Sequence, residues 1–172
     1  VNGSVVARNG STAGSNVVLG ALTGSGTLNG PSNSANTVIY RVGDKNAGST
    51  FSGVIQNGGF AGASAVLNKV GSATLTLSGA STYTGATTVS AGTLLVNGSL
   101  GGTNVAVNGG TIGGTGAIGG GVTVNSGASL SAGASIESLA TGALTLNNGS
   151  TFVFEAVNNS ATGADLLVAN GA

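Results

Sequence analysis

Apolar and polar residues alternate with a period of two along most of this 172-residue chain. Because successive side chains of a β-strand point to opposite faces, this period predicts strands. No window of helical length carries apolar residues at positions i, i+3, i+4 and i+7. The sequence therefore predicts an all-β protein, with the clearest alternation at Thr74–Leu77, Asn104–Val107, Gly121–Val124, Ala143–Leu146 and Thr151–Glu155.

One apolar run, Ala164–Ala169, fits either a helical turn or a strand. Gly163 precedes the run and Asn170-Gly171 follows it, so turn-forming residues bound it on both sides. These boundaries favour the strand.

The segment Val66–Val96 contains three short β-branched runs, at Ala73–Leu77, Thr87–Val89 and Thr93–Val96, separated by turn-forming triplets. Strands this short bury little surface alone, so we expect them to stack on similar units. The sequence also repeats itself loosely, which favours a solenoid over a sandwich. Val-Asn followed by a small residue recurs at Val1–Gly3, Val96–Gly98, Val107–Gly109 and Val124–Ser126.

We therefore predict a β-solenoid with three strands and about twenty residues per coil. That gives on the order of eight rungs and, at a strand spacing of about 4.8 Å, a rod roughly 40 Å long. Asn side chains at the corners can hydrogen-bond from rung to rung. The side chains predicted to point inward are Leu75, Leu77, Val89, Leu94, Val96, Val105, Val107, Val122 and Val124.

No linker divides the chain, so we expect one solenoid domain over residues 1–172. Within it, residues 61–172 carry the regular rungs and residues 1–60 the less regular ones. Residues 31–60 differ most, because they contain the single proline, three of the aromatic residues and a small cluster of charges. They fit either irregular rungs or an inserted hairpin.

The composition contains few residues of the types that catalyse reactions or bind metals, and many that form turns. Charged residues make up 5% of the chain against roughly a quarter in ordinary domains, and His, Cys, Met and Trp are absent. Gly supplies 34 residues, yet the apolar fraction of 40% argues against a disordered linker. Because Val1 begins a chain without Met, we expect it to come from a longer precursor by removal of a leader, or to be a fragment of one.

The charge balance limits the partners of the chain. Four basic and four acidic residues give a net charge of zero, which disfavours nucleic-acid binding and offers little repulsion against self-association. The longest apolar run, Val17–Leu22, is too short to cross a bilayer, so we expect no membrane insertion. Without Cys the chain has neither disulfides nor thiolate metal sites.

The segment Val66–Val96 resembles the autotransporter-associated β-strand repeat, the passenger-associated transport repeat of bacterial surface proteins. Three positions depart from the family's pattern: Asn68, Ala73 and Ser81. Flanking stretches at Thr50–Gly59 and Gly113–Gly133 extend the likeness over roughly residues 50–170. The positions that match are Leu67, Lys69, Gly71, Thr74–Gly79, Thr82–Gly85, Thr87–Val89, Ala91–Leu94 and Val96.

This resemblance implies a right-handed parallel β-helix in a secreted or surface-displayed bacterial protein. It also implies a role in transport and stalk formation, with any enzymatic activity located elsewhere. The family's repeat brings no catalytic residues, so we predict no catalytic, cofactor-binding or metal-binding residue in this chain, and no cofactor.

Three of the four acids, Glu137, Glu155 and Asp165, lie in the last third of the chain. If the rungs aligned them, they could bind Ca²⁺ or act as acid and base on a polysaccharide. A β-helix lyase also needs clustered basic residues, which are absent there. We therefore favour solvated side chains at strand ends.

The densest charge cluster is Arg41, Asp44 and Lys45. It fits a ligand contact less well than a surface turn with a weak ion pair. Gly113–Gly116 is rich in glycine like a phosphate loop, but no Lys-Ser/Thr pair or helix follows, which favours tight turns. Tyr83 could offer a surface for stacking carbohydrate, but packing of its ring over a neighbouring corner is the preferred interpretation.

Two other motifs give only weak support for a function. Thr-x-Thr at Thr74/Thr76 and Thr82/Thr84 resembles an ice-binding ladder but lacks a regular register. The Asn-x-Ser sequons fit chance turns better than glycosylation, and they begin at Asn2, Asn9, Asn97, Asn148 and Asn158.

Three classes of function remain open. The leading one is a non-catalytic structural element of the bacterial exterior, either a stalk or a fibre subunit. A fibre would form by end-to-end stacking of copies, because a solenoid has two open edges and few charges here protect them. An adhesin that binds surface polysaccharide is the second class, and a polysaccharide lyase is the third.

Overall fold

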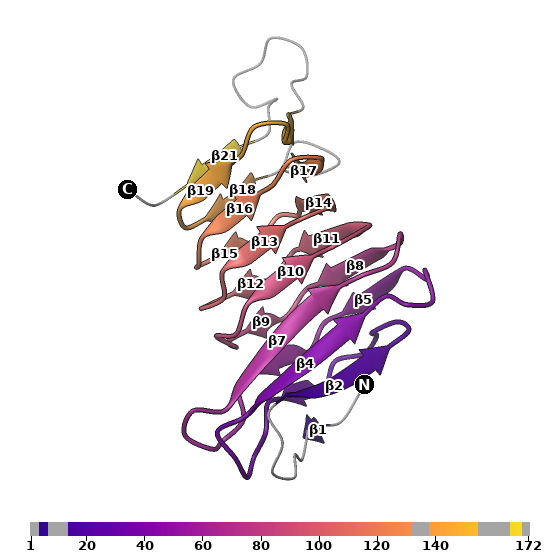
Figure 1. Cartoon of the computed structure of the whole chain (residues 1–172), viewed down its shortest axis with the longest axis vertical. Helices are drawn as coiled ribbons and strands as arrows, with labels where there is room; N and C mark the ends of the chain where they lie inside the picture. The colour runs from indigo at the N-terminus through magenta and orange to yellow at the C-terminus, as the bar shows by residue number, and fades with distance from the viewer. Residues whose placement is uncertain (1–3, 7–13, 132–137, 155–165, 170–172) are drawn as a thin grey trace.

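Parallel pairing between successive coils organises the chain. The computed structural model describes residues 4–6, 14–131, 138–154 and 166–169. Within these ranges every paired strand lies parallel to its neighbours, and no residue is helical. Figure 1 shows the strands stacked as successive coils along one long axis. The prediction of an all-β solenoid is confirmed, and its right-handed sense stays an expectation that the family resemblance implies.

The strands form three faces. The first face is a seven-stranded sheet of β2 (Ser15–Leu19), β4 (Thr37–Val42), β7 (Ser64–Lys69), β10 (Thr87–Val89), β13 (Val105–Val107), β16 (Val122–Val124) and β19 (Leu144–Leu146). The second face is a six-stranded sheet of β5 (Ser49–Phe51), β8 (Thr74–Leu77), β11 (Thr93–Val96), β14 (Gly110–Gly113), β17 (Ala128–Ser131) and β20 (Thr151–Val153).

The third face combines two sheets that adjoin. One contains β1 (Ser4–Val6), β3 (Thr27–Asn29) and β6 (Val54–Gln56). The other contains β9 (Ala80–Ser81), β12 (Ser99–Leu100), β15 (Ala117–Ile118), β18 (Ser138–Thr141) and β21 (Leu166–Ala169). The amide of Thr82 donates to the carbonyl of Ile55 at 2.9 Å, so the face continues across the junction.

Six full three-stranded turns result, from β4–β5–β6 to β19–β20–β21, rather than about eight. The estimate was high because the described residues before Thr37 contribute only β1, β2 and β3, which make no complete three-stranded turn. The coils also differ in length. Thr37 and Ser64, whose hydroxyls lie 2.8 Å apart on neighbouring coils, are separated by 27 residues of chain. Asn108 and Asn125 are separated by only 17. The division of the domain near residue 60 stays a prediction.

The core runs as columns of side chains along the solenoid axis. On the first face Val42, Lys69, Val89, Val107 and Val124 occupy successive levels of one column, as the strand register requires. Apart from the lysine, each level adds an apolar side chain that the next level covers. All nine side chains predicted to point inward are buried, which confirms the predicted core.

Residues 31–60 form a turn of the solenoid and not an inserted hairpin. They contain β4, β5 and β6, each of which pairs parallel with the next coil or the one before. Tyr40 and Phe51 are buried in the common core, whereas Phe60 is exposed. The run at Ala164–Ala169 includes β21, so the strand interpretation is also confirmed.

An asparagine ladder joins three coils at the corner after the first face. Asn147 donates from Nδ2 to Oδ1 of Asn125, and Asn125 donates in the same way to Asn108, both at 2.7 Å. An amide side chain can donate to the coil below and accept from the coil above at the same time, so identical residues at one corner satisfy each other. The predicted stacking of Asn at the corners is confirmed.

The corner between the second and third faces is built from a column of glycines: Gly26, Gly53, Gly79, Gly98 and Gly116. A Cβ on any of the last four would collide with the carbonyl oxygen of the glycine one coil below. That oxygen is already engaged, since the carbonyl of Gly79 accepts a hydrogen bond from the amide of Ser99 at 3.1 Å. Glycine is needed here because the next coil must come close enough to donate.

We expect Gly79→Ala to lower the free energy of unfolding by about 1–3 kcal/mol, because the added methyl group forces two hydrogen-bonded coils apart. Gly59→Ala is the matched control, since a Cβ there meets nothing within 4 Å. Chemical denaturation followed by circular dichroism measures both. Equal stability of the two variants would show that the corner can yield.

Candidate functional site

The residues proposed as a carboxylate cluster, Glu137, Glu155 and Asp165, lie outside the described residues. Their convergence therefore stays untested. In the described part of the chain, no group of three or more His, Cys, Asp or Glu side chains lies together as a metal site would require.

Arg41 and Asp44 form a surface ion pair at the end of β4. The guanidinium Nη2 lies 2.7 Å from Oδ1 of Asp44, and Nε donates to both carboxylate oxygens. The hydrogen bond from Arg41 holds the pKa of Asp44 below its ordinary value. Both side chains are solvated, so the pair adds little stability, and the interpretation as a surface turn is confirmed. Lys45 is exposed beside it.

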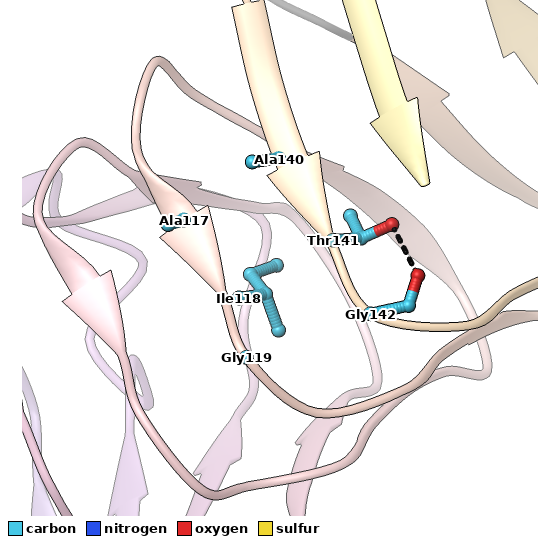
Figure 2. A pocket seen from close by; sticks show the side chains of 6 residues that line it. All are labelled: Ala117, Ile118, Gly119, Ala140, Thr141 and Gly142. Carbon is cyan, nitrogen blue, oxygen red and sulfur yellow. Dashed lines mark hydrogen bonds between the residues drawn. The ribbon is translucent and has the colours of Figure 1, made fainter. Parts of the chain in front are cut away.

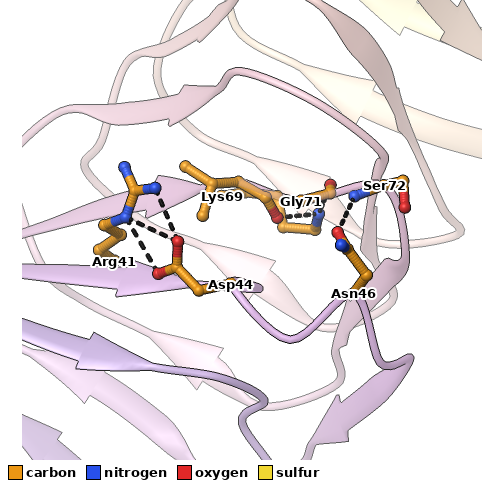
Figure 3. Close-up of polar contacts among 7 residues, drawn as sticks. Arg41, Asp44, Asn46, Lys69, Gly71 and Ser72 are labelled. Atoms are coloured by element: carbon orange, nitrogen blue, oxygen red, sulfur yellow. Dashed lines mark hydrogen bonds and ion pairs between the residues drawn. The ribbon is translucent and has the colours of Figure 1, made fainter.

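The most unusual chemical group of the described residues is the ammonium of Lys69, which sequence reasoning missed as a site. Lys69 ends β7, and its side chain is 1% exposed. Nζ donates to the carbonyls of Val70, Gly71 and Ala91 at 2.7, 2.9 and 3.1 Å. Figure 3 shows the chain of Lys69 curled back toward the turn at Gly71, away from the exposed Arg41–Asp44 pair.

These contacts explain why a lysine is tolerated in a core column. Its methylene stem fills the place that valine takes one coil above and below, and its ammonium reaches the corner. There it joins the turn after β7 to the turn after β10, which carries Ala91. Burial lowers the pKa of Lys69. Three carbonyls take the place of a carboxylate partner, and no described carboxylate forms an ion pair with it.

The alternation along β7 already contained a signal for this group. Ala65 and Leu67 point inward, so the same period places Lys69 inward as well. A lysine at an inward position must either reach solvent or find acceptors inside. The sequence could therefore have marked the residue as buried, although the identity of its three acceptors depends on how the coils stack.

Tyr83 is fully buried, so the idea that it offers a surface for stacking carbohydrate is wrong. Its hydroxyl lies 2.6 Å from Oγ1 of Thr87, which lies 3.0 Å from Oγ1 of Thr103. Thr103 in turn donates to the carbonyl of Gly85 at 2.7 Å. Burial raises the pKa of Tyr83. The chain of hydroxyls satisfies three buried polar side chains and leaves none of them free for a ligand.

Gly113–Gly116 is a tight turn, as expected. It begins at Gly113, the last residue of β14, leads into β15 rather than a helix, and has Gly114 in the left-handed region at φ 119°. The phosphate-loop alternative therefore lacks the helix N-terminus it needs.

A shallow pocket of about 190 Å³ lies on the third face between β15 and β18 (Figure 2). Its one side-chain hydroxyl, on Thr141, donates to the carbonyl of Gly142 at 3.1 Å. A pocket this small, lined by small or apolar groups and without a titratable side chain, offers no chemistry for catalysis. The residues that line it are Ala117, Ile118, Gly119, Ala140, Thr141 and Gly142.

Comparisons with known proteins identify one feature. Residues 67–96 match the family model of the passenger-associated-transport-repeat, so the resemblance seen in Val66–Val96 is confirmed for that segment. No curated protein and no solved structure matched the chain. Among the described residues, none belongs to a helix with the length and apolar character needed to span a bilayer.

We expect Lys69→Met to lower the free energy of unfolding by about 1–3 kcal/mol, because methionine keeps the stem but removes the donor to three buried carbonyls. Lys45→Met is the control, since that side chain is exposed and its loss should change stability by less than about 0.5 kcal/mol. Urea denaturation of both variants gives the comparison. An unchanged midpoint for Lys69→Met would mean that its hydrogen bonds contribute nothing net.

Alkaline pH should unfold the protein through its two buried tyrosines. Burial raises the pKa of Tyr40 to about 12 and raises that of Tyr83, against 10.0 for an exposed phenol. Above pH 10 the two tyrosines therefore lose their protons in the unfolded chain while they keep them in the folded chain. The stabilisation is therefore complete below pH 10 and is lost as the pH rises, by about 1.4 kcal/mol per pH unit for each tyrosine.

The tyrosine effect is best measured between pH 10.5 and 12. The lowered pKa of Lys69 makes stability rise with pH, which is the opposite effect, but only up to about pH 10.5, the ordinary pKa of lysine. Stability curves at several pH values, with tyrosinate absorbance as the titration signal, give the slope. Tyr40→Phe should remove one tyrosine's share of it. The same slope in wild type and variant would contradict the assignment.

Proposed function

We propose that this chain is a non-catalytic structural segment of a protein on the bacterial exterior, where it serves as a stalk. The observation that carries the proposal is a passenger-associated transport repeat at residues 67–96 that forms part of a continuous parallel solenoid. The repeat segment supplies strands to all three faces, so it has the same architecture as the coils above and below it.

The commitment of polar side chains to the fold supports a structural role. The ammonium of Lys69 is used by three carbonyls, and the hydroxyl of Tyr83 is used by Thr87. Arg41 is paired with Asp44 on the surface. Groups held in this way fix the coils relative to one another and have no position free at which to transfer a proton or attack a substrate.

The local character of the contacts supports export. In a solenoid each coil packs on its neighbours, so folding can begin at one coil and propagate to the next. A chain that crosses a membrane unfolded could therefore fold progressively as it emerges. This compatibility with export supports, beside the matched repeat, a location outside the cell, secreted or displayed at the surface.

An adhesin is the second candidate. It is favoured by Phe60, which is 45% exposed in the segment between β6 and β7. An exposed aromatic ring is a group on which a sugar can stack. Since the ring stands alone among polar and small neighbours in Asn57–Ala63, we rank this role below the stalk.

Surface display tests the stalk. The chain, with an epitope tag at its N-terminus, would be joined to a leader and an outer-membrane anchor in a Gram-negative bacterium. We expect antibody to label the tag on intact cells and external protease to leave the solenoid uncut. A Gly79→Val variant, in which the corner cannot close, should be degraded under the same conditions.

Retention inside the cell, or degradation of wild type as fast as the variant, would overturn the proposal. Cleavage of a polysaccharide by the purified chain, abolished by Glu137→Gln or Glu155→Gln, would overturn its non-catalytic part. Glycan binding that Phe60→Ala abolishes would establish the adhesin instead.

A further inference from the structure

Outward-facing hydroxyl groups recur in register on the second face. The pairing of β8, β11 and β14 places Thr74 beside Thr93 and Thr93 beside Thr111. β17 and β20 continue the series with Ser129 and Thr151. Thr74, Thr93 and Thr111 alternate with buried residues along their strands, so they point away from the core. These five residues are called the hydroxyl column below, and Figure 1 shows their strands stacked along the long axis.

This register partly corrects the expectation drawn from the Thr-x-Thr motifs. Thr82 and Thr84 follow β9 of the third face, so the two Thr-x-Thr pairs do not stack on each other, as the sequence indicated. Thr74 alone does recur, because the coils bring Thr93 and Thr111 into line with it. The regular row became visible only once the strands were paired.

The first face shows that such repetition is not a general property of outward positions in this chain. One outward column there mixes charged, amide, hydroxyl and apolar side chains in successive coils. Its members are Arg41, Asn68, Thr88, Ala106 and Thr123. The hydroxyl column is therefore a distinctive feature of the second face.

The hydroxyls of the column are not used by the fold as described. The buried hydroxyls of Thr87 and Thr103 are held by neighbouring side chains and carbonyls. Within the described part of the chain, by contrast, no hydrogen bond engages the hydroxyl of Thr74, Thr93 or Thr111. Each of these three side chains is partly exposed. The row is thus available to a ligand on a face where nothing in the described fold requires it.

The hydroxyl column is regular and stiff. Parallel strands lie about 4.8 Å apart, so the row presents one hydroxyl at each such interval. Because threonine is branched at Cβ, its side chain has few rotamers and needs little ordering when a ligand binds. A hydroxyl also donates and accepts hydrogen bonds at the same time. The row therefore fits a ligand that itself repeats and whose groups both donate and accept.

Ice has these properties. Its water molecules each donate and accept, and they repeat along rows of the crystal at a spacing close to that between strands. A polysaccharide fits less well, because sugars are held by aromatic rings and by planar carboxylate, amide or guanidinium groups. No residue of β5, β8, β11, β14, β17 or β20 carries such a planar group. The two aromatic rings, Phe51 and Phe152, lie in register with the buried Leu77 and Leu130.

We propose that the second face binds the surface of an ice crystal through the hydroxyl column. One hydroxyl gains little from ice, because liquid water offers it the same hydrogen bonds. Several hydroxyls fixed on one rigid body meet a row of the crystal together, and their contacts add. Liquid water has no such row, so the solid is favoured. A bound molecule then blocks growth of the crystal beneath it. This inference goes beyond the proposed structural role and does not depend on it.

The test compares the purified chain with Thr93→Tyr and Thr111→Tyr, in which a ring stands above the row and keeps a crystal surface away. Thr88→Tyr is the matched control, because Thr88 lies on the same coil as Thr93 and is also partly exposed, but on the first face. Tyrosine is a good strand former, so all three variants should fold. Circular dichroism melting checks this.

The readouts are the gap between the melting and freezing points of a single ice crystal and the inhibition of ice recrystallisation. We expect wild type and Thr88→Tyr to act alike in both. The two column variants should need at least about tenfold higher concentration for the same inhibition. Incorporation of the chain into slowly growing ice gives a third, direct measure of binding.

A wild type that has no effect on ice at millimolar concentration would overturn the proposal. Equal loss of activity in folded Thr88→Tyr and Thr93→Tyr would also overturn it, because the second face would then have no special part. Binding to crystalline cellulose that Thr93→Tyr abolishes, without an effect on ice, would assign the row to a polysaccharide instead. None of these results affects surface display, which tests the stalk alone.

Discussion

The close approach of successive coils is the constraint on which this structure depends. Parallel strands must lie about 4.8 Å apart for their ladders to form, and this spacing applies at the corners as well as on the faces. At the corner between the second and third faces the chain meets it with glycine, coil after coil, because a Cβ would occupy the place of a carbonyl that accepts the next hydrogen bond. Glycine at that corner is therefore a packing requirement.

Polar groups inside the solenoid follow from the same spacing. On coils that lie this close together, a buried donor or acceptor needs a partner on its own coil or the next. Lys69 meets this need with carbonyls from two coils, and the hydroxyls of Tyr83, Thr87 and Thr103 meet it with each other. At the surface, the asparagine ladder repeats the principle with identical side chains.

In a scaffold built in this way, each coil is stabilised by its own residues and its contacts with the neighbouring coils. Every coil carries its own share of core and corner, so the interior tolerates variation in coil length from 17 to 27 residues. Leu146 and Phe152, on the last described coil, are exposed, although the residues in register with them on the coil before, Val124 and Leu130, are buried.

The sequence by itself determined the strands and the side chains that face the core, because alternation is a local property that each strand carries in its own residues. Val89, Val107 and Val124 could be assigned inward without knowledge of any neighbour. The motif at Val66–Val96 likewise identified the repeat. Only the tertiary structure decided which coil lies on which, since coils of unequal length can be registered in several ways. That choice set the six full turns, the three acceptors of Lys69 and the burial of Tyr83, because each depends on residues that adjoin only after the coils have stacked.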